Sequence, residues 1–257
     1  AEDHLQIAID LDPEELSSRE MLGHLFLINR RYKEAEKEFL VLSNLDAYND
    51  NYMVTLADLA KLQEEWGTSI DYYLKAFDLN PQNLKALENA LQVCLGSELF
   101  KRAETICLKL AKNDPANISY WKTYKQITAY NKNYDRTFYA INEIERIEGT
   151  SDKLLMEKSA IKQEQNNNDE AVKYLLEAFD DNDPKIEVTQ RLVSIYLENE
   201  NINDAEYFNE ILLKEFPDDP SGYINASIIS LNNSLPQKAI EYLGPNIEKF
   251  EKNYSAN

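Results

Sequence analysis

Residues that could carry out catalysis are scarce in this chain of 257 residues. Its only two histidines, His4 and His24, leave almost no material for a histidine-based triad or a histidine-rich metal site. Cys94 and Cys107 have no histidine nearby, so they form no metal-binding motif. We expect both cysteines to pack as small buried side chains, with a disulfide between them as the alternative.

Sequence motifs for phosphate, zinc and calcium binding are absent as well. The run Asp180-Asp181-Asn182-Asp183 could attract a cation, but Asp and Asn are also ordinary residues of a turn that ends a helix. We therefore expect no catalytic residues, no metal site, and no nucleotide or redox cofactor. This composition favours a non-catalytic protein over an enzyme.

Acidic residues dominate the charge, with 46 Asp and Glu against 27 Lys and Arg and a formal net charge of -19. Such a charge repels a phosphate backbone, so nucleic acid is not an expected partner. The acidity either keeps the outer faces of helices in solution or presents an acidic surface to a basic partner.

The sequence has no apolar run long enough to span a membrane and does not open on a signal-peptide pattern. We expect a soluble protein, located in the cytoplasm or, if a signal peptide precedes Ala1, in the bacterial periplasm or cell envelope. The chain has no initiator Met, which favours a processed precursor or a fragment of a longer protein.

The elements that position any site follow from a repeat of 34 residues. Turn residues recur at this spacing: Pro13, Ala47, Pro81, Pro115, Gly149, Asp183 and Pro217. Small residues recur 22 positions after these turns: Ala35, Ser69, Ala103, Ala171, Ala205 and Ala239. Thr137 is the one larger residue at this spacing. Large residues follow four positions later: Phe39, Tyr73, Ile141, Leu175 and Leu243. The apolar residues between the turns have helical spacing, which predicts pairs of helices.

Each predicted helix is about 13 residues long, or about 20 Å. Small residues are needed where two helices cross closely, and large residues fill the space beside them. A single pair of this size cannot bury its own apolar stripe, so each pair must stack on its neighbours. The sequence therefore predicts an all-α solenoid with one continuous core.

This layout resembles the tetratricopeptide repeat, and the resemblance covers the whole chain. Two stretches match best: Met21-Leu22-Gly23 with Phe26, Tyr32, Ala35 and Phe39, and Leu56-Ala57 with Trp66, Ser69, Tyr73, Ala76 and Pro81. The resemblance implies a single right-handed superhelical solenoid over residues 1–257. Slot 1 of the 34 positions in each repeat falls at residues 16, 50, 84, 118, 152, 186 and 220. Residues 1–15 contain the second helix of an incomplete repeat, and residues 245–257 form a capping segment.

In this family, partners bind mostly to a concave wall formed by slots 2, 5, 9 and 12 of each first helix. The resemblance implies the following candidates on that wall: Glu20, His24, Asp58, Lys61, Gln92, Lys122, Gln126, Ile224, Ile228 and Leu231. A clamp for chaperone C-termini would require Lys at slot 5 and Asn at slot 9, where the first repeat has Glu20 and His24. No other repeat starts a complete clamp, so this mode of recognition is disfavoured.

Two stretches depart from this simple pattern. Gly244-Pro245 is expected to break the last helix, and the segment that follows, with Ile247 and Phe250, either covers the apolar wall around Ile228 or leaves it to a partner. In the fourth and fifth repeats, lysines and one threonine occupy slots that usually pack against neighbours: Lys125, Thr137, Lys158 and Lys162. These lysines must reach solvent, pair with carboxylates or mark a change of register, so we expect the fastest helical amide exchange between Ser119 and Gln165.

The sequence thus predicts a non-catalytic scaffold that holds a partner protein or peptide in its concave groove. The alternative is an architectural or regulatory segment of a larger protein, without a dedicated groove ligand. The stretch Ile144–Gly149, followed by a predicted helix, is also similar to repeat arrays in bacterial cell-envelope proteins.

Overall fold

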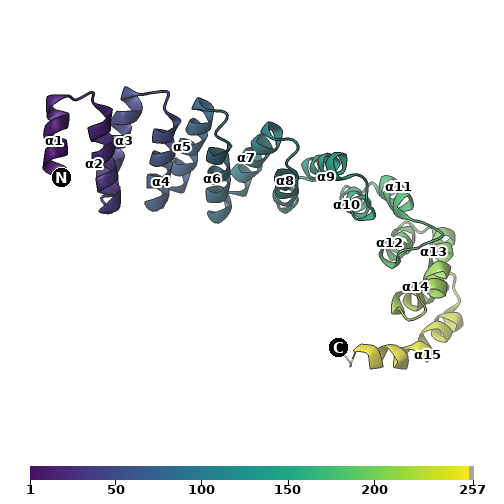
Figure 1. The fold of residues 1–257 in the computed structure, drawn as a ribbon. Coiled ribbons are helices and arrows are strands. Elements are labelled where there is room, and N and C mark those ends of the chain that lie inside the picture. Colours follow the sequence, from purple (N-terminus) through teal and green to yellow (C-terminus); the bar gives the residue numbers. More distant parts are fainter. Residues whose placement is uncertain (255–257) are drawn as a thin grey trace. The chain divides into compact units, whose positions relative to one another are not determined.

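A computed structural model describes residues 1–254 of the chain, with the backbone alone for residue 245 and residues 247–254. These residues form helices and no strand (Figure 1). The helices are α1 (Glu2–Leu11), α2 (Leu16–Ile28), α3 (Tyr32–Leu45), α4 (Asp50–Leu62), α5 (Trp66–Leu79), α6 (Leu84–Gly96), α7 (Phe100–Asn113), α8 (Ile118–Tyr130), α9 (Tyr134–Glu148), α10 (Asp152–Glu164), α11 (Asn168–Ala178), α12 (Ile186–Glu198), α13 (Ile202–Glu215), α14 (Pro220–Asn232) and α15 (Pro236–Tyr254). The predicted all-α class is confirmed.

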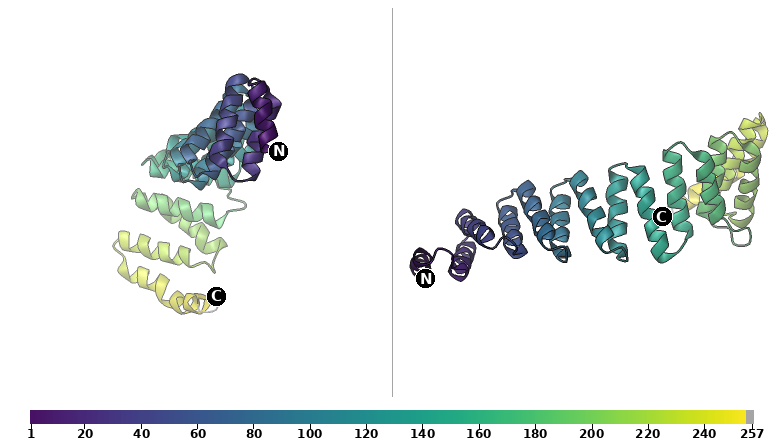
Figure 2. Two further views of the ribbon diagram at one scale, coloured as in Figure 1. Left: turned by 90° about the vertical axis from the view of Figure 1, so that its left-hand side faces the viewer. Right: turned by 90° about the horizontal axis from the view of Figure 1, so that it is seen from above.

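The chain forms two compact units, residues 1–133 and residues 134–257. Within each unit, consecutive helices pack against each other in chain order, and the right-hand view of Figure 2 shows this row for the first unit. The first unit contains α1 to α8, and the described part of the second contains α9 to α15. The continuity of one solenoid over residues 1–257 stays a prediction.

The even-numbered helices from α2 to α14 each contain 13 residues, and each begins at slot 1 of a repeat. Capping by the residue just before the helix, at slot 34, explains this regularity. Its side chain accepts hydrogen bonds from backbone N–H groups of the first turn at Glu15, Asn49, Asn83, Asn117, Ser151 and Asp219. Only Lys185, before α12, has no such bond. Side-chain capping satisfies donors that a helix start leaves unpaired.

The turn inside each helix pair is equally regular, because slot 15 adopts a left-handed backbone conformation in all seven repeats. The residues are Arg30, Glu64, Glu98, Lys132, Asn166, Glu200 and Ser234, with φ between 55° and 60°. In each turn the next N–H donates to a carbonyl five residues earlier, as from Glu65 N to Ala60 O at 2.8 Å. This is the Schellman ending of a helix, in which glycine is the usual left-handed residue.

Glycine at slot 15 should therefore stabilise the protein. Because a side chain disfavours the left-handed conformation, we expect Glu64→Gly to raise the free energy of unfolding by about 0.5–1 kcal/mol. Glu65→Gly is the matched control, since Glu65 has an ordinary φ of -85° and glycine there adds only unfolded-state entropy. Urea denaturation of both variants tests this, and equal changes in the two would refute the interpretation.

The small residues predicted at helix crossings form the tightest part of the core. Ala35, Ser69, Ala103, Ala171 and Ala205 are all 0% exposed, and even the larger Thr137 is buried. Close approach is visible at Gly23, where an added Cβ would lie 2.8 Å from the ring of Phe39. The large residues at slot 24 pack into the same space, and Phe39, Tyr73, Ile141 and Leu175 are buried. Interdigitation of small and large residues thus holds each pair together.

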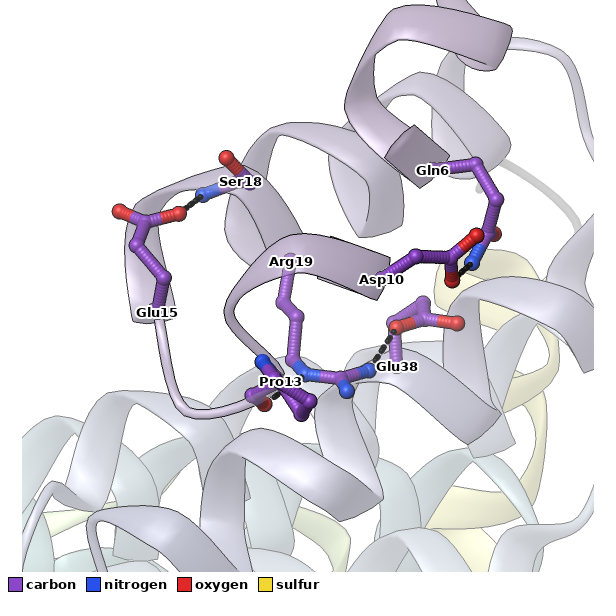
Figure 3. A network of polar contacts seen from close by, with 7 residues as sticks. All are labelled: Gln6, Asp10, Pro13, Glu15, Ser18, Arg19 and Glu38. Atoms are coloured by element: carbon purple, nitrogen blue, oxygen red, sulfur yellow. Dashed lines mark hydrogen bonds and ion pairs between the residues drawn. The ribbon is translucent and has the colours of Figure 1, made fainter. Parts of the chain in front are cut away.

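A polar network fastens the first helix pair to the chain before it (Figure 3). Arg19 donates through Nε to the carbonyl of Pro13 and through Nη1 to Glu38 on α3, both at 3.0 Å. Arg19 and Glu38 keep only 14% and 19% of their side chains exposed. Because Arg19 bonds both to Pro13 and to Glu38, the turn after α1 is tied to α2 and α3.

The two lysines of the fifth repeat that occupy packing slots, Lys158 and Lys162, pair with carboxylates. Lys158 is buried and lies 2.5 Å from Glu145, while Lys162 lies 2.7 Å from Glu170. Both ammonium groups also face the ring of Phe138, at 5.8 Å and 4.6 Å from its centroid. Of the three options that the sequence left open, pairing is therefore the one that the fold uses for these two residues. The prediction of fast amide exchange in this region stays a prediction.

The predicted break at Gly244-Pro245 is wrong, because α15 continues through both residues to Tyr254. Proline lacks an N–H group, so one backbone hydrogen bond of the helix is lost at Pro245. Its fixed φ is close to the helical value, so the helix can continue or bend there. The side chains of Ile247 and Phe250 lie outside the described residues, so their predicted role as a cover stays a prediction.

Candidate functional site

The predicted wall of the first unit contains carboxylates that are already bound within the unit. Glu20 accepts a hydrogen bond from the hydroxyl of Tyr52, which comes from the next repeat. Asp58 accepts from the hydroxyl of Tyr73 and from Lys61 Nζ, the latter at 3.1 Å. These contacts orient Glu20, Asp58 and Lys61 through bonds within the first unit.

Four other predicted residues of this wall are exposed on first helices of the first unit. His24 lies on α2, with its ring edge-on to Phe39 at a centroid distance of 5.3 Å. Gln92 lies on α6, and Lys122 and Gln126 lie on α8. Their exposure and placement on successive first helices are compatible with contact to an extended chain.

A third tyrosine–carboxylate pair joins α6 to α8. The hydroxyl of Tyr120 donates to Glu88 at 2.7 Å, and Lys85 Nζ lies 3.1 Å from the same carboxylate. The Tyr120 bond and then Lys85 lower the pKa of Glu88 below its ordinary value of 4.5. The pKa of Tyr120 is raised to about 12, mainly by burial and then by its hydrogen bond to Glu88. Tyr52 and Tyr120 both occupy slot 3, and Glu20 and Glu88 both occupy slot 5. The same tyrosine–glutamate pair therefore occurs twice, two repeats apart.

This pair should make the stability of the chain depend on pH. A carboxylate whose pKa is lowered on folding stabilises the folded state above its unfolded pKa, and that contribution is lost as pH falls through the folded pKa. We therefore expect Glu88→Gln to reduce the decrease in stability as the pH falls below about 4.5. Tyr120→Phe, which removes the main donor, should act in the same direction. Urea midpoints between pH 6 and pH 2.5 measure this, and unchanged pH profiles in both variants would refute it.

The three apolar residues predicted on the wall lie on α14 in the second unit. Ile224, Ile228 and Leu231 are 47%, 41% and 56% exposed. Because exposed aliphatic residues at slots 5, 9 and 12 share one helix face, they form a small apolar patch. The polar wall residues belong to residues 1–133 and this patch to residues 134–254. A single groove that combines the two sets stays a prediction.

A pocket of about 710 Å³ lies between α10 and α12. Its floor is apolar and is formed by Met156, Ala160, Ile186, Val188 and Phe216. Charged residues and one proline complete the lining: Asp152, Lys153, Glu157, Pro184, Lys185, Glu187 and Arg191. We call this pocket the α10–α12 groove.

The local path of the chain explains why the groove opens at this place. Helix α11 ends at Ala178, slot 27, whereas α3, α5, α7 and α13 continue to slot 30. The link from Phe179 to Lys185 is therefore longer than its counterparts. At its end, Lys185 pairs with Asp152 at the start of α10. Nearby, Arg191 Nη1 donates to the carbonyl of Met156 at 3.3 Å, which bridges α12 to α10 beside the floor.

The α10–α12 groove was not predicted as a site from the sequence. Met156 and Ala160 occupy wall slots 5 and 9, so their slots alone could have identified them as candidates. Ile186 and Phe216 do not occupy wall slots, yet both line the groove. One signal for the early end of α11 was present, because the run Asp180–Asp183 is typical of a turn that ends a helix.

Among the side chains that the structure describes, no three potential metal ligands form a cluster. Cys94 and Cys107 are buried free thiols, and burial raises their pKa values to about 11 and about 12. Such thiols are poor nucleophiles at neutral pH. None of the helices described here is both long enough and apolar enough to cross a membrane.

Comparison with known proteins gives matches at the level of structure. No protein-family model and no curated protein matches the sequence. The structure of Naa15/Naa10 bound to HypK-THB is similar, with 13% identity, a TM-score of 0.66, and 98% of this chain but 38% of that chain covered. YrrB, described as a TPR protein with an unusual peptide-binding site, has 13% identity and a TM-score of 0.41, with 78% and 100% covered. MamA from Desulfovibrio magneticus RS-1 has 10% identity and a TM-score of 0.39, with 63% and 92% covered.

At such identities, a structural match concerns the fold and not the ligand. Helix pairs that repeat every 34 residues, small residues at each crossing and the superposition over 98% of this chain agree with each other. The chain is a helical-repeat protein with the fold of the tetratricopeptide repeat proteins.

Proposed function

We propose that the chain is a protein-interaction scaffold whose second unit holds a segment of a partner protein in the α10–α12 groove. The observation that carries this proposal is the apolar floor of a pocket of about 710 Å³, open at the surface and surrounded by charged residues. Binding sites typically combine an apolar concave floor of several hundred Å³ with a few polar groups that orient the ligand. Bulky aliphatic side chains of the partner would fill this floor.

Neighbouring features support the same surface. Met156 and Ala160 are only half-buried, so an apolar ligand would remove further apolar area from water. The bonds of Lys185 and Arg191 across the rim hold α10 and α12 together without a ligand. A pocket that exists before binding loses less conformational entropy when it is filled. The patch at Ile224, Ile228 and Leu231 provides a second apolar contact in the same unit.

Methyl NMR tests this proposal directly, because the chain has only three methionines. Met156 lies in the groove, whereas Met21 and Met53 lie in the first unit and serve as internal controls. Nine-residue Gly/Ser peptides with a central Leu, Phe or Ser are titrated into the full chain. We expect the Leu and Phe peptides to shift the Met156 methyl signal, while the Ser peptide does not.

Ala160→Arg should abolish this shift, since a long side chain at slot 9 of α10 fills the groove. Ser194→Arg is the matched control, because Ser194 is exposed at slot 9 of α12 and does not line the groove. If the scaffold were purely architectural, Ala160→Arg and Ser194→Arg would have equal effects on partner binding. Shifts confined to the isoleucines of α14 would place the site elsewhere.

A further inference from the structure

The negative charge of the chain is concentrated in the unit that contains the groove. Residues 134–257 contain 25 Asp and Glu against 12 Lys and Arg, a formal net charge of -13. Residues 1–133 contain 21 against 15, a net charge of -6. The groove therefore lies in the more acidic half of the sequence, where the unit as a whole attracts cations.

The charged side chains that line the groove balance one another, with Asp152, Glu157 and Glu187 against Lys153, Lys185 and Arg191. Lys185 forms an ion pair with Asp152, and the guanidinium of Arg191 is bonded to the carbonyl of Met156. Glu187 is exposed on the rim. The lining is thus neutral overall, and the negative charge beside it comes from the adjoining link.

The link that ends at Lys185 carries Asp180, Asp181 and Asp183, all exposed. Their field reaches the rim, because the pKa of Lys185 is raised by its bond to Asp152 and, beyond that, by Asp183 and Asp180. Carboxylates beside an apolar surface act more strongly on a nearby cation than they would in bulk water. The chemistry of the site therefore combines an apolar floor with an acidic border.

We infer that the segment bound in the α10–α12 groove is a basic one, in which a bulky aliphatic residue lies between lysines or arginines. The aliphatic side chain would contact Met156, Ala160 and Phe216. The flanking cations would lie near Glu187 and the aspartates of the link. This inference rests on the proposed function, and it specifies the partner as a basic segment of another protein, since an acidic segment would meet like charges.

The probe is a pair of peptides with the same central Leu, Gly-Lys-Lys-Leu-Lys-Lys-Gly and Gly-Glu-Glu-Leu-Glu-Glu-Gly, each blocked at both ends. Met156 methyl shifts give the two dissociation constants with the full chain. At low salt we expect the lysine peptide to bind at least about tenfold more tightly, and the difference to shrink in 0.5 M NaCl because salt screens the charges.

Variants of the chain separate local from general electrostatics. Glu187→Lys should weaken the lysine peptide severalfold. Glu177→Lys makes the same charge change on α11, away from the groove lining, and should have a smaller effect. Ala160→Arg should remove binding, whereas Ser194→Arg should reduce it only through its charge.

Each result leads to a separate conclusion. Equal affinity for the lysine and glutamate peptides would overturn the basic partner while leaving the groove as a binding site. Equal losses in Ala160→Arg and Ser194→Arg, or in Glu187→Lys and Glu177→Lys, would show non-specific attraction and also overturn it. If no Leu peptide of either charge shifts Met156, the proposed function itself fails.

Discussion

Replacing Glu145 by Gln is expected to lower the free energy of unfolding by about 3 kcal/mol, because it leaves a buried ammonium group without its counterion. The side chain of Lys158 is 7% exposed, and Glu145 lies 2.5 Å from it. The rings of Phe138 and Tyr174 face the same ammonium group at 5.8 Å and 5.5 Å. These ring contacts are too weak to replace a carboxylate in a buried site.

The control for this prediction is Glu143→Gln on the same helix. Glu143 and Glu145 both keep 22% of the side chain exposed, but Glu143 pairs with Arg146, which is 57% exposed. Loss of a solvent-exposed pair should cost about 0.5 kcal/mol or less. Urea denaturation of the two variants gives the comparison, and equal losses would show that Lys158 does not depend on Glu145.

A double variant tests the reason for the loss. Lys158→Met removes the buried charge, so Glu145→Gln combined with Lys158→Met should recover most of the stability of the wild type. A buried ion pair can often be replaced by apolar side chains at little cost, while the removal of one partner is costly. A double variant no more stable than Glu145→Gln would place the loss in packing and not in charge.

Trp121→Ala is expected to cost about 3–5 kcal/mol, because it removes the largest fully buried side chain. The indole is 1% exposed and lies at right angles to Tyr124, with a centroid distance of 6.3 Å. Its N–H donates to the carbonyl of Pro115 at 3.1 Å, which fastens the turn between α7 and α8. The substitution therefore creates a cavity and removes a tertiary hydrogen bond.

The second tryptophan of the chain provides a matched control. Trp66 begins α5 and is 40% exposed, so Trp66→Ala should cost about 1 kcal/mol or less. Each variant keeps one tryptophan, and fluorescence during urea denaturation measures both. A loss from Trp66→Ala as large as that from Trp121→Ala would contradict the burial that separates the two residues.

The starts of the helices are marked by signals that lie close together in the sequence. Residues that cap a helix act on N–H groups two or three positions later, as Asn49 does for Asn51. The cap at slot 34 therefore identifies the start of a helix without knowledge of the fold. The ends were less visible, because the left-handed residues at slot 15 include Glu64, Glu98 and Glu200, and no glycine. Stacking of neighbouring helices can impose that conformation on residues that do not prefer it.

The sequence did not predict most side-chain contacts between repeats, although one polar position recurs. Slot 14 holds a polar side chain in every repeat: Asn29, Gln63, Ser97, Asn131, Gln165, Asn199 and Asn233. Several of these reach the preceding second helix, as from Gln165 Nε2 to Asp135 at 2.8 Å and from Asn131 Nδ2 to Glu104 at 2.6 Å. The pattern repeats every 34 residues, but the partners vary in type and slot, so spacing alone does not identify them.

The sequence by itself determined the 34-residue period, the all-helical class and the small residues at the crossings. Those features depend on packing between adjacent helices. The size of the residues and their helical spacing predict that packing directly. Tertiary structure alone decided that Lys158 is buried against Glu145, that α15 continues through Pro245, and that a groove opens between α10 and α12. Each of these depends on how far one helix extends or turns relative to the next. Small differences in helix length, such as the early end of α11, determine that geometry without changing the 34-residue period.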